Sequence, residues 1–126
     1  MQGRRLNTRE VGKQSEELAC RFLQKKGYRI LTTNYRQRFG EIDIIAEKGE
    51  QLVFVEVRSL HGSERLQPEE TVGVPKQLRL SRTAMAYIQQ HGHEDRPARF
   101  DIISVDLSAD RPSCRHIEDA FESLEC

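Results

Sequence analysis

Two strand-like runs separated by two residues constrain the fold of this chain more than any other feature. Residues 41–48 (EIDIIAEK) and 51–58 (QLVFVEVR) are rich in β-branched side chains, and Gly49 and Glu50 stand between them. Glycine at the first of two loop residues suits a type II′ turn, which joins antiparallel strands. The sequence therefore predicts a hairpin in which residue 48 faces residue 51 and the pairing continues from there.

This hairpin brings charged residues onto one face of otherwise apolar strands. In the predicted register Asp43 faces Glu56 and Glu41 faces Arg58, and the two-residue period puts all four on the same face. Directly facing carboxylates repel each other unless something offsets their charge. Three explanations stay open from the hairpin alone: a divalent metal ion, an ion-pair network with Arg58 and the arginines of residues 36–38, or a solvated face.

The remaining periodicity predicts two helices and three further strands. A helix is expected over residues 8–26, with Thr8 as N-cap and Gly27 as its stop. A second helix is expected over residues 75–90, because Pro75 suits a first turn and apolar or small residues recur at helical spacing. That inner stripe consists of Leu78, Ser81, Ala84, Met85 and Ile88. Strands are expected at residues 28–35, 99–107 and, as a short edge, 115–121.

The resulting order, α-β-β-β-α-β with an added edge strand, predicts an α/β fold: a mixed sheet flanked by helices in a single domain spanning residues 1–126. Three segments are expected to lie outside this core. They are a basic N-terminal arm at residues 1–8, a flexible loop at 60–74 and an acidic C-terminal tail at 108–126.

Composition excludes several classes of protein. No run reaches the roughly 18–20 apolar residues of a membrane span, and the N-terminus lacks the apolar run of a secretory signal. Three cysteines without CxxC spacing argue against a disulfide framework or a zinc site. We therefore expect a cytoplasmic protein that makes no contact with a membrane.

Charge alternates along the chain although the formal net charge is zero. Residues 1–38 hold ten Lys and Arg against three acids, and residues 39–74 hold three against eight. Basic side chains that could follow a phosphate backbone are Arg4, Arg5, Arg9, Lys13, Arg36, Arg38, Lys76 and Arg79. An ordinary solvated mixture of charges is the alternative interpretation.

A third carboxylate is predicted near the hairpin acids. Glu16 lies on the flank of the first predicted helix, beside its apolar stripe, whereas Glu17 points away toward solvent. Glu16 could therefore reach the mouth of a site formed by Asp43 and Glu56. The alternative is a flank glutamate that extends into water.

Several of these residues fall in a recognisable pattern. The segments NYRQRFGEIDIIA at 34–46 and LVFVEVR at 52–58 resemble the signature of the YraN-like family. The resemblance covers roughly residues 11–107 and includes Glu16, Lys76 and the segment RFDI at 99–102. This widespread bacterial family of uncharacterised proteins is regarded as a branch of the PD-(D/E)xK nuclease superfamily, to which archaeal Holliday-junction resolvases are distantly related.

The resemblance implies a restriction endonuclease-like α-β-β-β-α-β core and a catalytic site. Asp43 and Glu56 would be the acids that bind Mg²⁺ or Mn²⁺, together with the main-chain carbonyl of Val57. Glu16 would match the helix-borne acid, and Arg58 stands where the superfamily has its lysine. Arginine keeps a positive charge for phosphate oxygens but cannot act as a base.

Three hypotheses about function follow, two of which involve nucleic acid. The first is a metal-dependent endonuclease that cleaves structured or duplex DNA. The residues expected to contact the DNA phosphate backbone are Arg36, Arg38, Lys76 and Arg79. The second is a catalytically weakened or inactive nucleic-acid-binding module of the same fold, suggested by Arg58. The third is a protein with no nucleic-acid role. The resemblance also leaves a homodimer open, because the related resolvases act as dimers.

Overall fold

The computed structural model describes residues 7–60, 72–108 and 110–123, and within these ranges the chain forms two helices and five strands. Their order follows the sequence prediction, including the edge strand expected at the C-terminal end. The elements are α1 (Thr8–Lys25), β1 (Arg29–Gln37), β2 (Gly40–Lys48), β3 (Gln51–Leu60), α2 (Val74–Gln90), β4 (Ala98–Asp106) and β5 (Ser113–Phe121).

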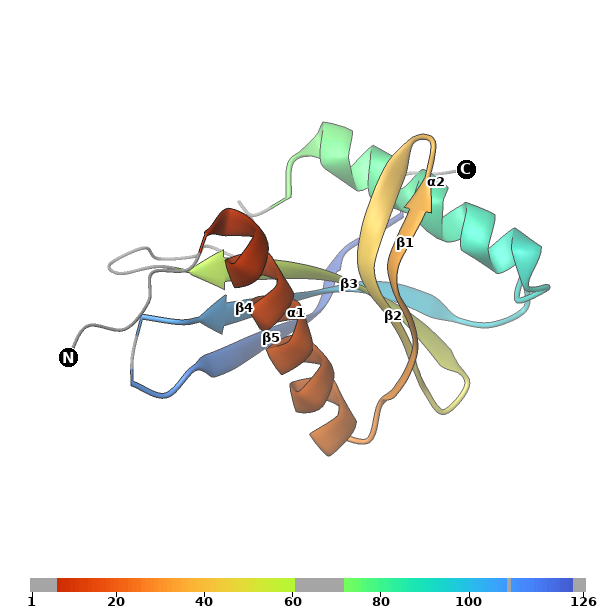
Figure 1. The fold of residues 1–126 in the computed structure, drawn as a ribbon. Coiled ribbons are helices and arrows are strands. Elements are labelled where there is room, and N and C mark those ends of the chain that lie inside the picture. Colours follow the sequence, from red (N-terminus) through yellow and green to blue (C-terminus); the bar gives the residue numbers. More distant parts are fainter. Residues whose placement is uncertain (1–6, 61–71, 109, 124–126) are drawn as a thin grey trace.

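The five strands form one mixed sheet in sequence order, β1-β2-β3-β4-β5. Neighbouring strands are antiparallel except β3 and β4, which are parallel and are connected through α2. Figure 1 shows α1 crossing the sheet while α2 lies beside the curled β1–β2 hairpin. This arrangement confirms the predicted α/β fold and is consistent with a restriction endonuclease-like core.

The predicted register of the central hairpin is confirmed for residues 44–48 opposite residues 51–55. Lys48 pairs with Gln51, and the β2–β3 ladder runs from there to Ile44 opposite Val55. Gly49 occupies the first turn position with φ of 60°, a left-handed conformation that favours glycine. Ile44 is the last paired residue of β2, so the ladder does not include Asp43.

Alternating side chains of the sheet supply two apolar cores. On one face Ala19 and Leu23 of α1 pack on Ile44, Val53, Val55, Ile103 and Val105. On the other face α2 packs on a second set, which includes Ile42, Ile45, Phe54, Phe100 and Ile102. The two helices therefore cover opposite faces of the sheet.

The buried face of α2 differs from the predicted stripe. Ser81 and Ala84 are buried as expected, but Leu78, Met85 and Ile88 are only half-buried. Their places are taken by Leu80, Thr83 and Tyr87. Thr83 is part of this buried face and packs closely against Gly40 of β2, where a Cβ atom would lie 2.8 Å from Thr83 Oγ1.

The N-terminus of α1 also differs by one residue from the prediction. Asn7 is the N-cap, and its side chain accepts a hydrogen bond of 2.8 Å from the Glu10 amide. Glu10 returns the contact, since its carboxylate accepts from the Asn7 amide at 3.1 Å. This capping box needs a glutamate three residues after the cap, which Asn7 has and Thr8 lacks.

A buried ion-pair network joins β4, β5 and the start of β1. The Asp101 carboxylate is fully buried and lies 2.6 Å from Nε2 of His116 and 2.9 Å from Nε of Arg99. It also accepts from the Asp119 amide at 2.9 Å. Arg99 Nη2 in turn lies 2.5 Å from the Tyr28 hydroxyl. The network joins β4 and β5 to Tyr28, the residue before β1.

The three segments expected outside the core are described only in part. Residues 1–6 of the basic arm and 61–71 of the loop lie outside the described residues, and Thr8 and Val74 already belong to helices. The acidic tail contains β5, which is longer than the short edge strand expected there. Among the described helices none is long and apolar enough to span a membrane.

Candidate active site

The site is built around a break in the hairpin at Asp43. Ile42 packs in the α2-side core and Ile44 in the α1-side core, although residues two apart in a regular strand share a face. At this break Asp43 Oδ2 accepts a hydrogen bond of 2.8 Å from the backbone N–H of Val57. A side chain thus satisfies an amide of β3 just beyond the end of the ladder.

Asp43 and Glu56 are brought together as predicted. The two carboxyl groups are close enough for Glu56 to act directly on the ionisation of Asp43. Burial and then the negative charge of Glu56 raise the pKa of Asp43 from 3.8 to about 7, against the lowering effect of the Val57 N–H. The Glu56 side chain is only 7% exposed. Two carboxylates this close and this buried form a site that favours a positive charge.

Two basic side chains form ion pairs with Glu56. Lys76, in the first turn of α2, forms an ion pair with Glu56 Oε2, and Arg58 Nε lies 3.5 Å from the same oxygen. Both basic residues were predicted site residues, Lys76 for nucleic acid and Arg58 in the lysine position of the superfamily. In the structure they share one carboxylate.

The predicted pairing of Glu41 with Arg58 is absent from the described ladder. Glu41 pairs with Arg36 of β1, and its Oε2 lies 3.2 Å from Arg36 Nε. The physical reason is the break at Asp43, which ends the β2–β3 ladder while the β1–β2 ladder continues to Gly40. Glu41 therefore takes its cross-strand partner from the other neighbouring strand.

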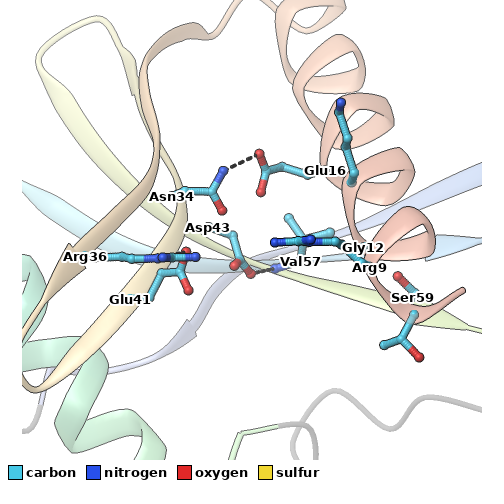
Figure 2. A pocket seen from close by; sticks show the side chains of 11 residues that line it. Arg9, Gly12, Glu16, Asn34, Arg36, Glu41, Asp43, Val57 and Ser59 are labelled. Atoms are coloured by element: carbon cyan, nitrogen blue, oxygen red, sulfur yellow. Dashed lines mark hydrogen bonds and ion pairs between the residues drawn. The ribbon is translucent and has the colours of Figure 1, made fainter.

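Glu16 faces the hairpin from α1, as predicted. Asn34 of β1 donates a hydrogen bond of 2.8 Å from Nδ2 to Glu16 Oε1 (Figure 2). Burial raises the pKa of Glu16, and the Asn34 hydrogen bond opposes this effect. Asn34 has φ of 53°, which asparagine tolerates better than most residues. A bend in β1 therefore aims the amide at the helix.

Two cavities meet at these acids. A cavity of about 440 Å³ lies between α1 and strands β1, β2 and β3. Its lining includes Glu16, Asn34 and Asp43. A second cavity of about 370 Å³ lies between the hairpin and α2 and is lined by Glu56, among others. Residues common to both walls are Glu41, Asp43 and Val57.

Basic residues rim both cavities. The first has Arg9 and Lys13 of α1 and Arg36 of β1 in its lining, and Figure 2 shows Arg9 and Arg36 on opposite sides of Asp43. The second has Lys76 and Arg79. Predicted residue Arg38 lies elsewhere: it is exposed in the turn between β1 and β2 and lines neither cavity.

The donor set suits a hard divalent cation. Carboxylate and carbonyl oxygens are the ligands of Mg²⁺, which keeps several waters and is held by one or two carboxylates. Asp43 and Glu56 supply two carboxylates at one point. Among the described residues no group of three His, Cys, Asp or Glu side chains converges closely enough to hold an ion, so Glu16 stands apart from this pair.

Three contributors were missed by the sequence reasoning. The hydrogen bond from Asn34 to Glu16 and the one from the Val57 amide to Asp43 were not predicted. The close packing of α2 at Gly40 was not predicted either. Asparagine inside a β-branched strand is a usable signal, because it marks left-handed backbone. The Val57 amide and the Gly40 packing leave no signal in a single sequence, since both depend on tertiary contacts.

Comparison with known proteins places the chain in a family. A family profile described as "Uncharacterised protein family UPF0102" matches residues 15–105, a segment that includes Glu16, Asp43, Glu56 and Lys76. The chain belongs to the UPF0102 family. This confirms the resemblance to YraN-like proteins, while membership of the nuclease superfamily stays a prediction.

Relatives in the UPF0102 family match along most of their length. A UPF0102 protein of Syntrophus aciditrophicus is 44% identical over 112 residues, which are 89% of this chain and 88% of the relative. One from Symbiobacterium thermophilum is 44% identical over 117 residues, 92% and 99% of the two chains. One from Thermotoga petrophila is 48% identical over 93 residues, 74% and 83% of the two chains. None of these names states an activity.

Proposed function

We propose that this protein is a metal-dependent endonuclease that cleaves phosphodiester bonds in structured or duplex DNA. The observation that carries the proposal is the Asp43–Glu56 pair, with Glu56 buried, beside two cavities with basic rims. Paired acids at a surface depression, flanked by basic side chains, suit a polyanion held against a metal ion.

Asp43, Glu56 and the Val57 carbonyl would hold the Mg²⁺ or Mn²⁺ ion, and Glu16 lies in the wall of the same cavity as Asp43. The ion would supply Lewis-acid stabilisation of the phosphate and a water of lowered pKa. The protein fixes Asp43 for this task through the Val57 N–H, so one carboxylate oxygen is held while the other stays available.

The basic residues would position the DNA backbone. Arg9, Lys13 and Arg36 would bind phosphates in the first cavity, and Lys76 and Arg79 in the second. Arg58 keeps its charge beside Glu56 and would stabilise negative charge on the cleaved phosphate, but it cannot remove a proton from water. Base removal of that proton therefore belongs to another group or to solvent.

A cleavage assay with radiolabelled branched, nicked and linear duplex DNA tests the proposal. Wild-type protein with Mg²⁺ or Mn²⁺ is expected to cut at least one substrate, and EDTA should abolish cutting. Asp43→Asn should lose activity by about a hundredfold or more, since it removes a ligand charge. The matched control is Glu17→Gln, an exposed acid beside Glu16 that lines neither cavity. Retained cleavage by Asp43→Asn contradicts the proposal.

One observation favours a second candidate, a nucleic-acid-binding module that has lost cleavage. Lys76 and Arg58 together neutralise Glu56, a state in which the acids need no metal. Such a module would bind DNA without metal and with an affinity that falls steeply with salt. Arg58→Lys separates the two candidates: cleavage gained only in this variant identifies a decayed nuclease.

A further inference from the structure

Two cations share one oxygen of Glu56, but they stand on different elements. Lys76 reaches Glu56 Oε2 from α2, whereas Arg58 reaches it from two residues along the same strand. A carboxylate that is 7% exposed needs such partners to offset its loss of hydration. Glu56 is therefore already neutralised in the metal-free protein.

The proposed metal ion would need this same oxygen. Positive charges repel one another, so a divalent ion and the Lys76 ammonium compete for Glu56. Arg58 is attached to β3 itself, while Lys76 extends on a four-carbon stem from a helix and has a side chain 39% exposed. Lys76 also lines the cavity of about 370 Å³, together with Arg79. Lys76 is therefore the cation that can leave.

Resting on the proposed function, we infer that Lys76 is a displaceable counter-ion of Glu56. It neutralises Glu56 when no metal is bound, and it moves onto a DNA phosphate in the neighbouring cavity when a divalent ion takes its place. A phosphate in that cavity draws Lys76 away from Glu56 in return. Metal and DNA thus strengthen each other's binding, because coupling between two sites is reciprocal.

Calorimetric titration with Mn²⁺ alone tests this role without any need for cleavage. Lys76→Met is expected to bind Mn²⁺ at least about tenfold more tightly than wild type, since a neighbouring cation changes the proton affinity of a carboxylate by about one to three orders of magnitude. Lys25→Met is the matched control, because it removes an exposed lysine at the far end of α1. Its Mn²⁺ affinity should stay within about twofold of wild type.

A second variant guards against misfolding. Lys76→Gln keeps a hydrogen-bond donor for Glu56 without the charge, and it should show the same gain in Mn²⁺ affinity. Gain in both Lys76 variants supports the inference, including the case in which wild type binds no Mn²⁺. Equal or weaker binding by both variants overturns it, and leaves the proposed function standing if wild type binds Mn²⁺. Absence of Mn²⁺ binding in every variant overturns both.

Discussion

Asp43 Oδ2 accepts a hydrogen bond of 2.8 Å from the backbone N–H of Val57, at the point where the β2–β3 ladder has ended. This single bond sets the geometry of the site. It replaces a ladder hydrogen bond with a side-chain bond, and it holds the Asp43 carboxyl against Glu56. A hairpin that continued regularly would place the two acids face to face without an amide to orient either.

The raised pKa of Asp43 predicts an unusual dependence of stability on pH. Because the pKa is about 7 in the folded protein and near 3.8 when unfolded, the folded state retains a proton between these values. This contribution to stability is complete below pH 4 and is lost as pH rises through 7. Ionised Asp43 is therefore destabilising at pH 8 in the absence of metal.

Asp43→Asn should for this reason unfold less readily than wild type at pH 8 in EDTA. Its free energy of unfolding is expected to be higher by on the order of 2 kcal/mol, and the difference should vanish near pH 4. The asparagine oxygen can still accept from the Val57 N–H. Urea denaturation at several pH values measures this, with Glu17→Gln as control. A variant less stable than wild type at pH 8 would show that the ionised form of Asp43 is favoured by the fold.

The Asn34 hydrogen bond predicts a change in the titration of Glu16. Asn34→Gly keeps the left-handed backbone at φ 53° but removes the amide donor, so the pKa of Glu16 should rise further. NMR titration of the Glu16 side chain measures it. Asn34→Ala should show the same rise and lose about 1 kcal/mol more stability than Asn34→Gly, because alanine is strained in left-handed backbone and glycine is not. An unchanged Glu16 titration in both variants would refute the coupling.

Gly40 is predicted to set how closely α2 approaches the hairpin. In Gly40→Ala the new Cβ would lie 2.8 Å from Thr83 Oγ1 and 3.3 Å from the Arg79 carbonyl. Thr83 Oγ1 cannot turn aside easily, because it donates to that carbonyl at 2.7 Å. We expect a loss of about 1–3 kcal/mol in unfolding free energy. Thr83→Ala should recover part of it in the double variant, and strictly additive losses would argue against this contact.

The hairpin was the part of the fold that sequence could predict best, because its strands are continuous, β-rich and joined by a two-residue glycine loop. The pairing of Lys48 with Gln51 and the approach of Asp43 to Glu56 follow from that register. Glu16 was found because helical periodicity places it on the flank of α1. The local signals at these positions agree with the tertiary structure.

Other features depended on contacts that periodicity does not encode. The break at Asp43 leaves Glu41 paired with Arg36, and α2 buries Leu80, Thr83 and Tyr87 in place of three predicted residues. Lys76 and Glu56 form an ion pair although they are twenty positions apart in the sequence. The sequence between them has no periodic pattern from which their contact could be predicted. Sequence could mark Lys76 as basic, but only the packing of α2 shows which acid it contacts.

The buried Asp101 network predicts a structural role that is separate from the cavities. Burial alone would raise the pKa of Asp101, but hydrogen bonds from His116, Arg99 and the Asp119 amide lower it below its usual value. This stabilisation is present above the unfolded pKa near 3.8 and is lost as pH falls through the lower folded value. Asp101→Asn should therefore destabilise the domain by about 3 kcal/mol or more at pH 7.

Thermal unfolding followed by circular dichroism measures the effect of Asp101→Asn, with the exposed Asp95→Asn as control. The loss should shrink below pH 4, where wild type begins to lose the same interaction. A variant as stable as wild type at pH 7 would show that the network contributes nothing net to folding.

We propose that Asp43 and Glu56 together bind a divalent metal ion at a DNA-binding surface. Calorimetric titration of Mn²⁺ into wild type, Asp43→Asn and Glu56→Gln, each with and without a short DNA duplex, tests it most directly. Wild type is expected to bind one Mn²⁺ per chain, and more tightly with DNA present, whereas both variants should lose Mn²⁺ binding. Unchanged Mn²⁺ binding in Asp43→Asn, or no binding by wild type even with DNA, would contradict it.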